Sequence, residues 1–402
     1  MADGAVEPQR KVSGMLRAAA LGMAALLAAC STGPRIIPEV ERPPVVEAPR
    51  ERPVIRPIAP GLPQDAERHR VALLVPLTGP NAGVGKSLAN ATQLAILDTK
   101  SDVVRITTYD TAGGAANAAS QAIAEGNTLI LGPLLAEDAR EVAPIARRAR
   151  VPVLSFSNDT SVAGGGTYLL GYSPTQSIER VVAHARISGI SDFAGLIPSG
   201  LYGERASTAL LRAVEEAGGK VLAMETFDSR PGSMTSAITK LGRVPYQAVL
   251  IAGSGGSAVA AVPVIRRSAS GRTARILGTE LWNTDSGIGA NASLNGAWFA
   301  SVPDSYYRQY ATKYRARFGA APYRMSTMGY DAVLLTIRIA RDWRPGDAFP
   351  EARLTERDGF SGLDGAFRFG RNGIAERALE VQEVRGGTTA TVSPAPANFR
   401  GN

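Results

Sequence analysis

The side chains that could carry nucleophilic or metal chemistry are few in this chain of 402 residues. It contains one cysteine, Cys30, and two histidines, His69 and His184. One cysteine excludes an intramolecular disulfide, and two histidines so far apart lack the spacing of zinc ligands. A Ser-His-Asp triad could use either histidine, but His69 falls in a proline-rich segment and His184 on an expected helix surface. The sequence therefore predicts a protein that is not an enzyme, with no catalytic residue, metal or cofactor.

One glycine-rich segment has the context of a phosphate-binding loop but not its spacing. An apolar run at 71–76 leads into LTGPNAGVGKS and then into a helical pattern. A P-loop needs glycine, four residues, and then Gly-Lys-Ser/Thr. Counting back from Lys86, the first glycine falls on Pro80, and Gly79 is one residue too far. Because ligands of open α/β sheets bind at the carboxyl ends of strands, Thr78 in this turn is a candidate ligand contact.

The length, composition and net charge of the chain limit the classes of protein to which it can belong. A folded region of this length exceeds one hydrophobic core and should divide into two units. Hydrophobic residues make up 45% and charged residues 20%, as in ordinary globular proteins. The net charge of +8 is scattered along the chain, and no aromatic-basic platform accompanies it, which disfavours a nucleic-acid partner. No apolar run reaches the ~18 residues that a transmembrane helix needs.

Residues 1–29 have the pattern of an export signal. Arg10, Lys11 and Arg17 precede the apolar run AAALGMAALLAA at 18–29, which is too short to span a bilayer as a helix. Translation from Met15 would give a signal of more usual length.

Small residues stand directly before Cys30, in LAAC, and resemble a bacterial lipobox. In lipobox proteins the cysteine is lipidated and the signal is cut before it. An aspartate after that cysteine favours retention in the inner membrane, so Ser31 implies the periplasmic face of the outer membrane. The alternative is a simple secretory signal with an incidental cysteine, but the only cysteine stands at this one position.

A proline-rich stretch follows the cysteine. Residues 31–70 contain nine prolines, seven arginines and six acids, too few apolar groups to offset the entropy of ordering. We expect residues 30–69 to form a disordered tether. At ~3.1 Å per residue, an extended proline-rich spacer of this length reaches up to roughly 120 Å.

From residue 70 onward, apolar runs alternate with amphipathic patterns, which indicates parallel sheets with right-handed crossovers. The run at 71–76 has the continuous apolar character of a strand buried on both faces. Expected strands are 71–76, 103–108, 128–131, 151–156, 193–198, 221–227, 248–252, 275–277, 360–369 and 378–384. Expected helices include 136–149, 202–217, 233–241, 256–267, 304–318 and 325–343. The aromatic stripe Tyr307, Tyr310, Tyr314 and Phe318 has helical spacing and indicates core packing.

Four segments resemble the type I periplasmic binding proteins of the leucine/isoleucine/valine-binding kind. The resemblance implies an α/β fold with two Rossmann-like lobes, whose parallel sheets are joined by a three-crossing hinge. The segments are VALLVPLTGPNAGVGKSLANATQLAI (71–96), LILGPLLAEDAREVAPIARRARVPVLSFSN (129–158), LIPSGLYGERASTALLRAVEEAGGKV (196–221) and YRQYATKYRARFGAAPYRMSTMGYDAVLLTI (307–337).

The same resemblance implies where the chain passes between lobes, namely near 171–175, 302–304 and 344–349. Lobe 1 then comprises 70–175 plus 303–345, lobe 2 comprises 176–302 plus 346–386, and 387–402 forms a flexible tail.

Within that superfamily, GPLLAEDAREVAPIA is most similar to the penicillin-binding protein activators, lipoproteins of the LppC/LpoA type. This implies a non-enzymatic outer-membrane lipoprotein whose partner is a bifunctional penicillin-binding protein, a peptidoglycan synthase. The best-known members carry an additional N-terminal helical-repeat domain, and no repeat pattern is visible here.

The alternative is a solute receptor of a branched-chain amino acid ABC importer, with a small molecule bound in the interlobe cleft. Its candidate contacts are Thr78, Ser157, Asn158, Tyr202, Glu280 and Trp282. By resemblance, Glu280 falls where such receptors hold the ammonium of an amino acid. The receptors hold the carboxylate with hydroxyl residues after the third strand, but here 134–137 reads Leu-Leu-Ala-Glu. Each candidate also has a local explanation, for example Ser157 and Asn158 as a turn cap.

Overall fold

The computed structural model describes residues 67–399. The expected signal at 1–29, the lipidation site Cys30 and nearly all of the tether lie outside the described residues. Within 67–399, the helices are too short or too polar to cross a bilayer.

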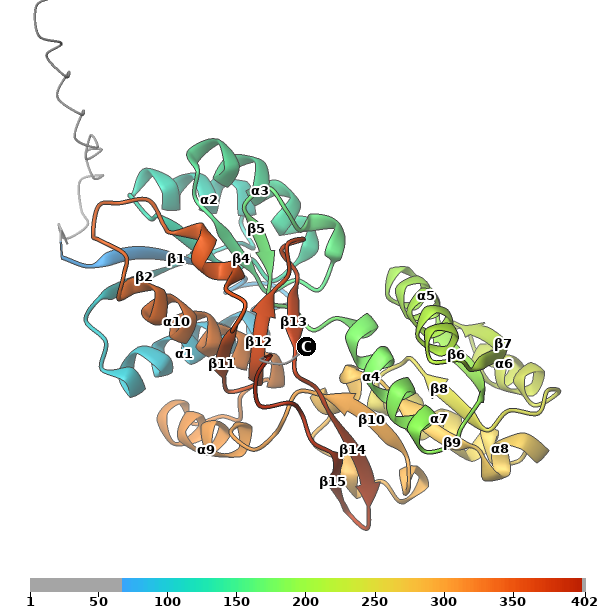
Figure 1. The fold of residues 1–402 in the computed structure, drawn as a ribbon. Helices are drawn as coiled ribbons and strands as arrows, with labels where there is room; N and C mark the ends of the chain where they lie inside the picture. The colour runs from blue at the N-terminus through green and yellow to red at the C-terminus, as the bar shows by residue number, and fades with distance from the viewer. Residues whose placement is uncertain (1–66, 400–402) are drawn as a thin grey trace, which may run out of the picture. The chain divides into compact units, whose positions relative to one another are not determined.

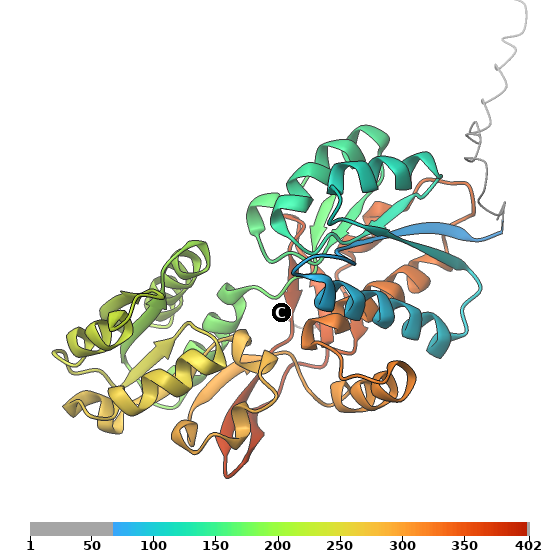
Figure 2. The same cartoon turned by 180° about the vertical axis from the view of Figure 1, so that it is seen from behind.

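The first lobe contains a five-stranded parallel sheet of order β2-β1-β3-β4-β5. Side chains alternate along β1, so Val71, Leu73 and Val75 pack with α1 and α10. Ala72 and Leu74 point to the opposite face, toward α2 and α3 (Figures 1 and 2). Burial on both faces explains why this strand is a continuous apolar run. The elements are β1 (His69–Val75), β2 (Val104–Asp110), β3 (Leu129–Leu131), β4 (Val153–Ser155), β5 (Thr167–Leu169), α1 (Ala82–Thr99), α2 (Ala115–Ala124), α3 (Ala136–Ala149), α9 (Tyr307–Phe318) and α10 (Thr327–Ala340).

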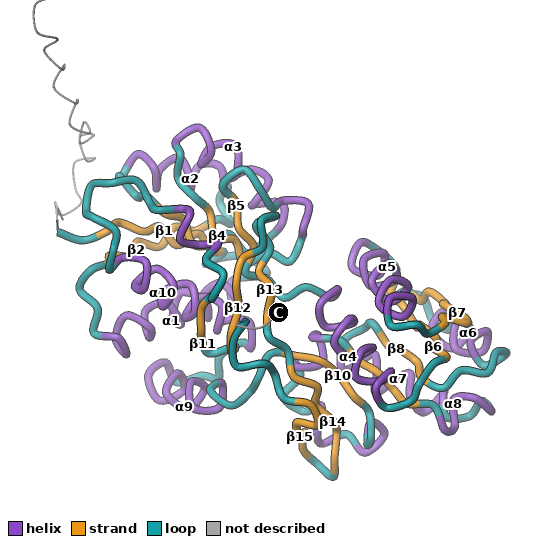
Figure 3. Tube along the Cα trace, viewed as in Figure 1, coloured by secondary structure: helices purple, strands orange, loops and turns teal. Residues whose placement is uncertain are grey.

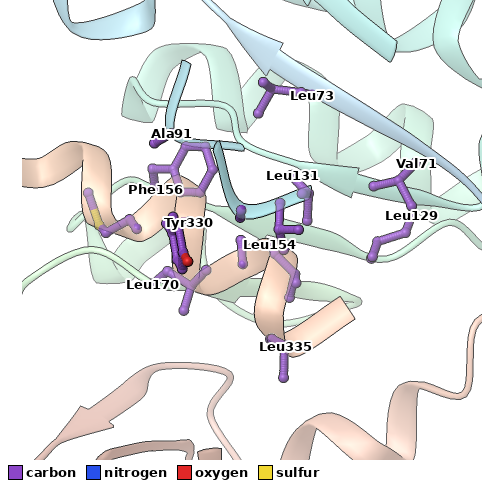
Figure 4. Packing of buried hydrophobic residues seen from close by; sticks show 14 of the residues in the cluster. Val71, Leu73, Ala91, Leu129, Leu131, Leu154, Phe156, Leu170, Tyr330 and Leu335 are labelled. Carbon is purple, nitrogen blue, oxygen red and sulfur yellow. The ribbon is translucent and has the colours of Figure 1, made fainter. Parts of the chain in front are cut away.

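Figure 4 shows the larger of these two packing layers, in which Phe156 and Leu170 lie with Tyr330 and Leu335 of α10. Tyr310 and Tyr314 of α9 are buried in the same core, so the aromatic stripe is packing, as its spacing indicates.

The second lobe contains a seven-stranded sheet of order β15-β14-β10-β9-β8-β6-β7. The strands from β10 to β7 run parallel, whereas β14 and β15 pair antiparallel at one edge. The elements are β6 (Asp192–Pro198), β7 (Lys220–Phe227), β8 (Ala248–Ile251), β9 (Arg275–Gly278), β10 (Trp298–Ser301), β14 (Glu380–Arg385), β15 (Thr388–Ser393), α4 (Pro174–Ile187), α5 (Leu201–Glu216), α6 (Ser233–Leu241), α7 (Gly255–Ile265) and α8 (Ala269–Thr273). The two lobes confirm the predicted α/β fold class.

A small antiparallel sheet corrects the expected lobe boundary. It comprises β11 (Phe360–Gly362), β12 (Gly365–Phe369) and β13 (Ala375–Arg377), drawn as three orange strands in Figure 3. Phe360, Phe367 and Phe369 are buried in the core of the first lobe with α10. Assigning 346–386 to the second lobe was therefore wrong up to Arg377, and so was a crossing near 344–349. The chain reaches the second sheet only between β13 and β14.

The expected strand 360–369 is in fact a tight hairpin, because Leu363 and Asp364 form the turn between β11 and β12. The expected flexible tail is also wrong in its first part, since residues 388–393 form strand β15. Gly386 and Gly387 have φ of 50° and 97°, and this two-residue turn pairs Arg385 with Thr388. Glycines with positive φ are favoured in such hairpins.

His69 is the first residue of β1 and does not lie in a linker. Its buried ring stacks on Trp343 with 3.7 Å between centroids, and its Nε2 lies 2.9 Å from the Trp343 carbonyl oxygen. Burial lowers the pKa of His69. His184 lies on α4 and packs edge-on against Trp298. Both histidines therefore have packing roles.

Candidate functional site

Three sequence-predicted residues stand at carboxyl ends of strands in the first lobe. Thr78, after β1, is exposed, and its hydroxyl donates to Asp110 Oδ2 at 2.8 Å. Backbone N–H groups of Ala112 and Leu77 hold the pKa of Asp110 below its usual value. Ser157, after β4, is buried, and its Oγ accepts from the Asp159 backbone N–H at 3.1 Å. Thr78 is therefore already bonded to the end of β2, and Ser157 is engaged within its own turn.

Asn158 is exposed, and its carbonyl oxygen accepts from Arg205 Nη1 of α5 at 3.3 Å. The same guanidinium forms an ion pair with Asp159. Asp159 also accepts from Arg140 of α3 at 2.5 Å. Burial alone would raise the pKa of Asp159, but the hydrogen bonds from Ser161 and Arg205 outweigh it and bring the pKa to about 2. Asp159 thus joins a helix of each lobe through two arginines.

This ion-pair cluster was not predicted from the sequence. Asp159 directly follows the predicted residues Ser157 and Asn158, and this position is the only indication of the cluster in the sequence. Its two arginine partners come from α3 and α5, and nothing in their local pattern distinguishes them from the many other arginines.

Glu280 is buried in the second lobe, at the start of the short helix η2 (Glu280–Thr284) that follows β9. Its Oε2 accepts from the Ser177 hydroxyl of α4 at 2.5 Å. Its Oε1 accepts from the Tyr202 hydroxyl of α5 at 3.0 Å, and that hydroxyl also lies 2.9 Å from Thr279 Oγ1. Burial raises the pKa of Glu280, and the hydrogen bond from Ser177 opposes this rise. The structure thus brings Glu280 and Tyr202 together, as one internally bonded group.

Trp282 does not lie with these groups. Its ring is fully buried in the apolar core of the second lobe, tilted against Phe299. A Cβ added to Gly278 would stand 2.4 Å from this ring, so the indole is packed directly on the end of β9. Including Trp282 among the ligand contacts is therefore corrected: it is a packing residue.

A buried charge network occupies the junction between the lobes. Arg324 Nη1 donates to Asp364 Oδ1 at 2.7 Å, and Nη2 lies 3.3 Å from Asp304. Tyr172 donates to Asp364 Oδ2 at 2.6 Å, and Thr327 donates to the same oxygen at 2.8 Å. Burial would raise the pKa of Asp364, but the charge of Arg324 holds it below its usual value. We call Tyr172, Asp304, Arg324, Thr327 and Asp364 the hinge network.

The hinge network connects to the Glu280 group through a small pocket. Glu280, Tyr172, Arg324 and Arg377 all line it. Arg377 donates to the Leu170 carbonyl oxygen at 2.6 Å, and its guanidinium lies 5.1 Å from the ring of Tyr172. The residues that line this pocket include some from all three segments in which the chain crosses between the lobes. The pocket therefore places the buried carboxylate of Glu280 and the guanidinium groups of Arg324 and Arg377 on one surface at the junction of the lobes.

Asp331 of α10 makes the junction sensitive to pH. Its Oδ1 accepts from the Leu363 backbone N–H at 2.6 Å. Burial, together with the neighbouring charge of Asp364, raises its pKa to about 7. The folded state therefore holds this proton more tightly than the unfolded state does, so this group's stabilising contribution falls as pH rises from about 4 to about 7.

We expect Asp331→Asn to remove that loss, because asparagine keeps the Oδ1 acceptor and cannot ionise. Relative to wild type, the variant should gain stability with rising pH by up to ~1.4 kcal/mol per pH unit. Urea unfolding of both proteins from pH 4.5 to pH 8 measures this difference. A stability difference that stays constant over this range would contradict the prediction.

Comparisons with known proteins agree with the architecture. A curated relative, an uncharacterized protein of Rickettsia prowazekii, is 21% identical over 173 residues, covering 42% of this chain and 46% of that protein. The match therefore spans less than half of that relative's length.

Two solved structures illustrate the fold. The branched-chain amino acid ABC transporter periplasmic ligand-binding protein of Burkholderia xenovorans is 17% identical with a TM-score of 0.69, covering 83% of this chain and 97% of that one. The LpoA C-domain of Haemophilus influenzae, described as a regulator of PBP1A, is 19% identical with a TM-score of 0.62, covering 80% and 99%. At these identities, the likeness shows the fold alone.

The family comparison covers nearly the whole described region. The periplasmic binding protein family model matches residues 69–389, a range that contains both lobes and all three crossings. The chain belongs to the periplasmic binding protein family.

Proposed function

We propose that this protein is a non-enzymatic envelope lipoprotein that binds and activates a peptidoglycan synthase of the bifunctional penicillin-binding protein class. One observation carries the proposal: the groups with which a receptor of this fold would hold an amino acid are already bonded to the protein itself. Both carboxylate oxygens of Glu280 accept hydroxyl hydrogen bonds from Ser177 and Tyr202. A ligand ammonium would have to compete with these donors for a carboxyl whose pKa burial raises.

The described residues also offer few free hydrogen-bond donors for the carboxylate of such a ligand. Leu134 packs against the core of the first lobe, and no hydroxyl occurs in 134–137. Arg205 contacts Asn158, but Asp159 holds this guanidinium in an ion pair. A ligand carboxylate would therefore have to displace Asp159, which is itself anionic.

The similarity to the LpoA C-domain supports the same proposal, because LpoA is described as a regulator of PBP1A. The lipobox-like segment and the proline-rich stretch add to it from the sequence. In this proposal the lipid anchors the chain at the outer membrane, and the long spacer lets the two-lobed domain reach a synthase. No nucleic acid takes part.

We expect leucine, isoleucine and valine to bind weakly or not at all. Charge-assisted hydrogen bonds are worth about 1.5–3 kcal/mol each. Losing one or two of them lowers affinity by roughly ten- to ten-thousand-fold. Calorimetry on the unlipidated protein from residue 31 onward measures this. A sub-micromolar dissociation constant for any of the three would contradict the prediction and favour the alternative, a solute receptor of an ABC importer.

The proposed function itself is tested by adding the same unlipidated protein to a purified bifunctional penicillin-binding protein and measuring the rate of glycan-strand synthesis and cross-linking. We expect the rate to increase. A parallel pull-down from envelope extract separates the two functions, because recovery of a synthase supports activation and recovery of a permease supports import.

A further inference from the structure

A broad groove runs beside α9 and shares Asn283, Thr284 and Arg324 with the small pocket that Glu280 lines. One wall is α9, with Arg308 and Arg315, and the other includes the start of β15 at Thr388 and Thr389. The groove contains about 1630 Å³ of empty space, counting the part that is open to solvent. We call it the α9 groove. Because its lining extends from α9 to the start of β15, the groove suits an extended chain segment better than a single amino acid.

The base of the α9 groove is tied together by one carboxylate. Asp304 pairs with Arg324 and accepts from Gln382 Nε2 of β14 at 3.4 Å. The Asn283 amide donates at 3.2 Å to Asp304 Oδ2, the oxygen that also accepts from Gln382, in the orientation that satisfies both polar atoms of the amide. Elements on both sides of the groove therefore meet at Asp304, which fixes the distance between the walls at this point.

The α9 wall carries two arginines that make no ion pair with any described residue. Arg308, Ala311 and Arg315 all line the groove, and this spacing places them on one face of the helix. Arg308 and Arg315 are exposed. By contrast, Lys313 on another face of α9 pairs with Asp98 at 2.9 Å. Two acids also line the groove, but Asp304 is engaged by Arg324 and Gln382, and Asp285 accepts from the Gly287 backbone N–H. The α9 wall therefore presents two cations that are unpaired within the described part of the chain, which favours carboxylates.

The opposite wall begins with an edge strand. β15 pairs with β14 on one side and ends the seven-stranded sheet. Its sequence TTATVS contains neither charge nor proline, and these are the residues that natural edge strands use to prevent pairing. The other edge strand, β7, carries Lys220 and Glu225, and Glu225 pairs with Lys240. By the absence of charge and proline, β15 is the less protected edge, although Gly289 packs on the Thr388 backbone at its start and Arg180 binds Ser393 at its end.

We propose that the α9 groove binds an acidic, extended segment of a partner protein, added as a strand beside β15 with its carboxylates facing Arg308 and Arg315. Main-chain hydrogen bonds to an edge supply affinity in such complexes, and alternate side chains supply specificity. The inference rests on the proposed function, in that the chain acts by docking to another protein.

A synthetic peptide of about eight residues that alternates threonine with glutamate is the probe, and its threonine–lysine counterpart is the first control. We expect the acidic peptide to bind the unlipidated protein and the basic peptide not to bind. Arg308→Glu with Arg315→Glu should weaken binding at least about tenfold, because like charges then face each other. Arg317→Glu is the matched control. It is exposed on the same helix outside the groove, and it should change affinity by less than about twofold.

Backbone methylation separates strand addition from simple charge attraction. In an added strand only every second residue directs its N–H toward the edge. We therefore expect peptides N-methylated at all glutamates or at all threonines to differ, with one losing binding and the other keeping it. Equal binding of both methylated peptides, or binding of the lysine peptide, would overturn the proposal.

The synthase assay distinguishes this inference from the proposed function. If the protein stimulates a synthase but does not bind the acidic peptide, the groove proposal fails and the function stands. If the peptide binds in one methylation frame but no synthase is stimulated, the groove proposal stands and the function fails.

Discussion

Arg324→Met is expected to lower the free energy of unfolding by about 3–5 kcal/mol, because it leaves a buried charge without its partner. The Arg324 side chain is 4% exposed and that of Asp364 is 0% exposed. Tyr172 and Thr327 would still donate to Asp364, but no cation would remain at hydrogen-bond distance. Urea unfolding at neutral pH measures the loss.

A matched surface pair provides the control. Arg212 and Glu216 lie 3.9 Å apart on α5, with side chains 70% and 66% exposed, and Arg212→Met should cost less than about 1 kcal/mol. Adding Asp364→Asn to Arg324→Met removes the unpaired charge and keeps an acceptor for Tyr172, so it should restore part of the stability. If Arg324→Met costs no more than Arg212→Met, the hinge network does not stabilise the fold.

Cys30→Ala is expected to release the protein from the membrane. Lipidation of this cysteine would hold the protein through buried acyl chains, each methylene contributing about 0.8 kcal/mol. Losing an anchor built from many methylenes changes partitioning by many orders of magnitude. Detergent phase partitioning and incorporation of labelled palmitate measure the change.

Replacing the residue after the cysteine keeps the proposed lipidation site intact. Ser31→Ala should remain lipidated and partition into detergent. Ser31→Asp should also be lipidated, with retention in the inner membrane as the lipobox resemblance implies. Membrane association of Cys30→Ala at the wild-type level would show that the anchor lies elsewhere.

The regular core of the fold could be predicted because its signals are local. β1 is a continuous apolar run that reports burial on both faces, and α3 begins with Glu137 and Asp138 and ends with Arg147 and Arg148, as the helix dipole favours. The predicted ranges 136–149 and 233–241 match α3 and α6 residue for residue.

Some of the short strands were not predicted. β5 has three residues and β10 has four, and neither length provides a periodic pattern that sequence analysis can use. β11 to β13 depend on the first lobe for burial of Phe360 and Phe367, so their position followed from packing partners far away in the chain. The Gly386-Gly387 turn can be recognised in the sequence. The strand that follows it, β15, was not predicted, because its pairing with β14 stabilises it.

In the candidate site, too, some features could be predicted from the sequence and others could not. Residue types and resemblance pointed to Glu280 and Tyr202, and only the tertiary structure showed that these two side chains bond to each other. The hinge network unites positions 172, 304, 324, 327 and 364, and Asp159 joins arginines of α3 and α5. Patterns along a sequence report the periodicity of one element at a time. Charge pairing between distant elements depends on distances of a few ångströms that the packing of both lobes sets, so the tertiary structure alone decided it.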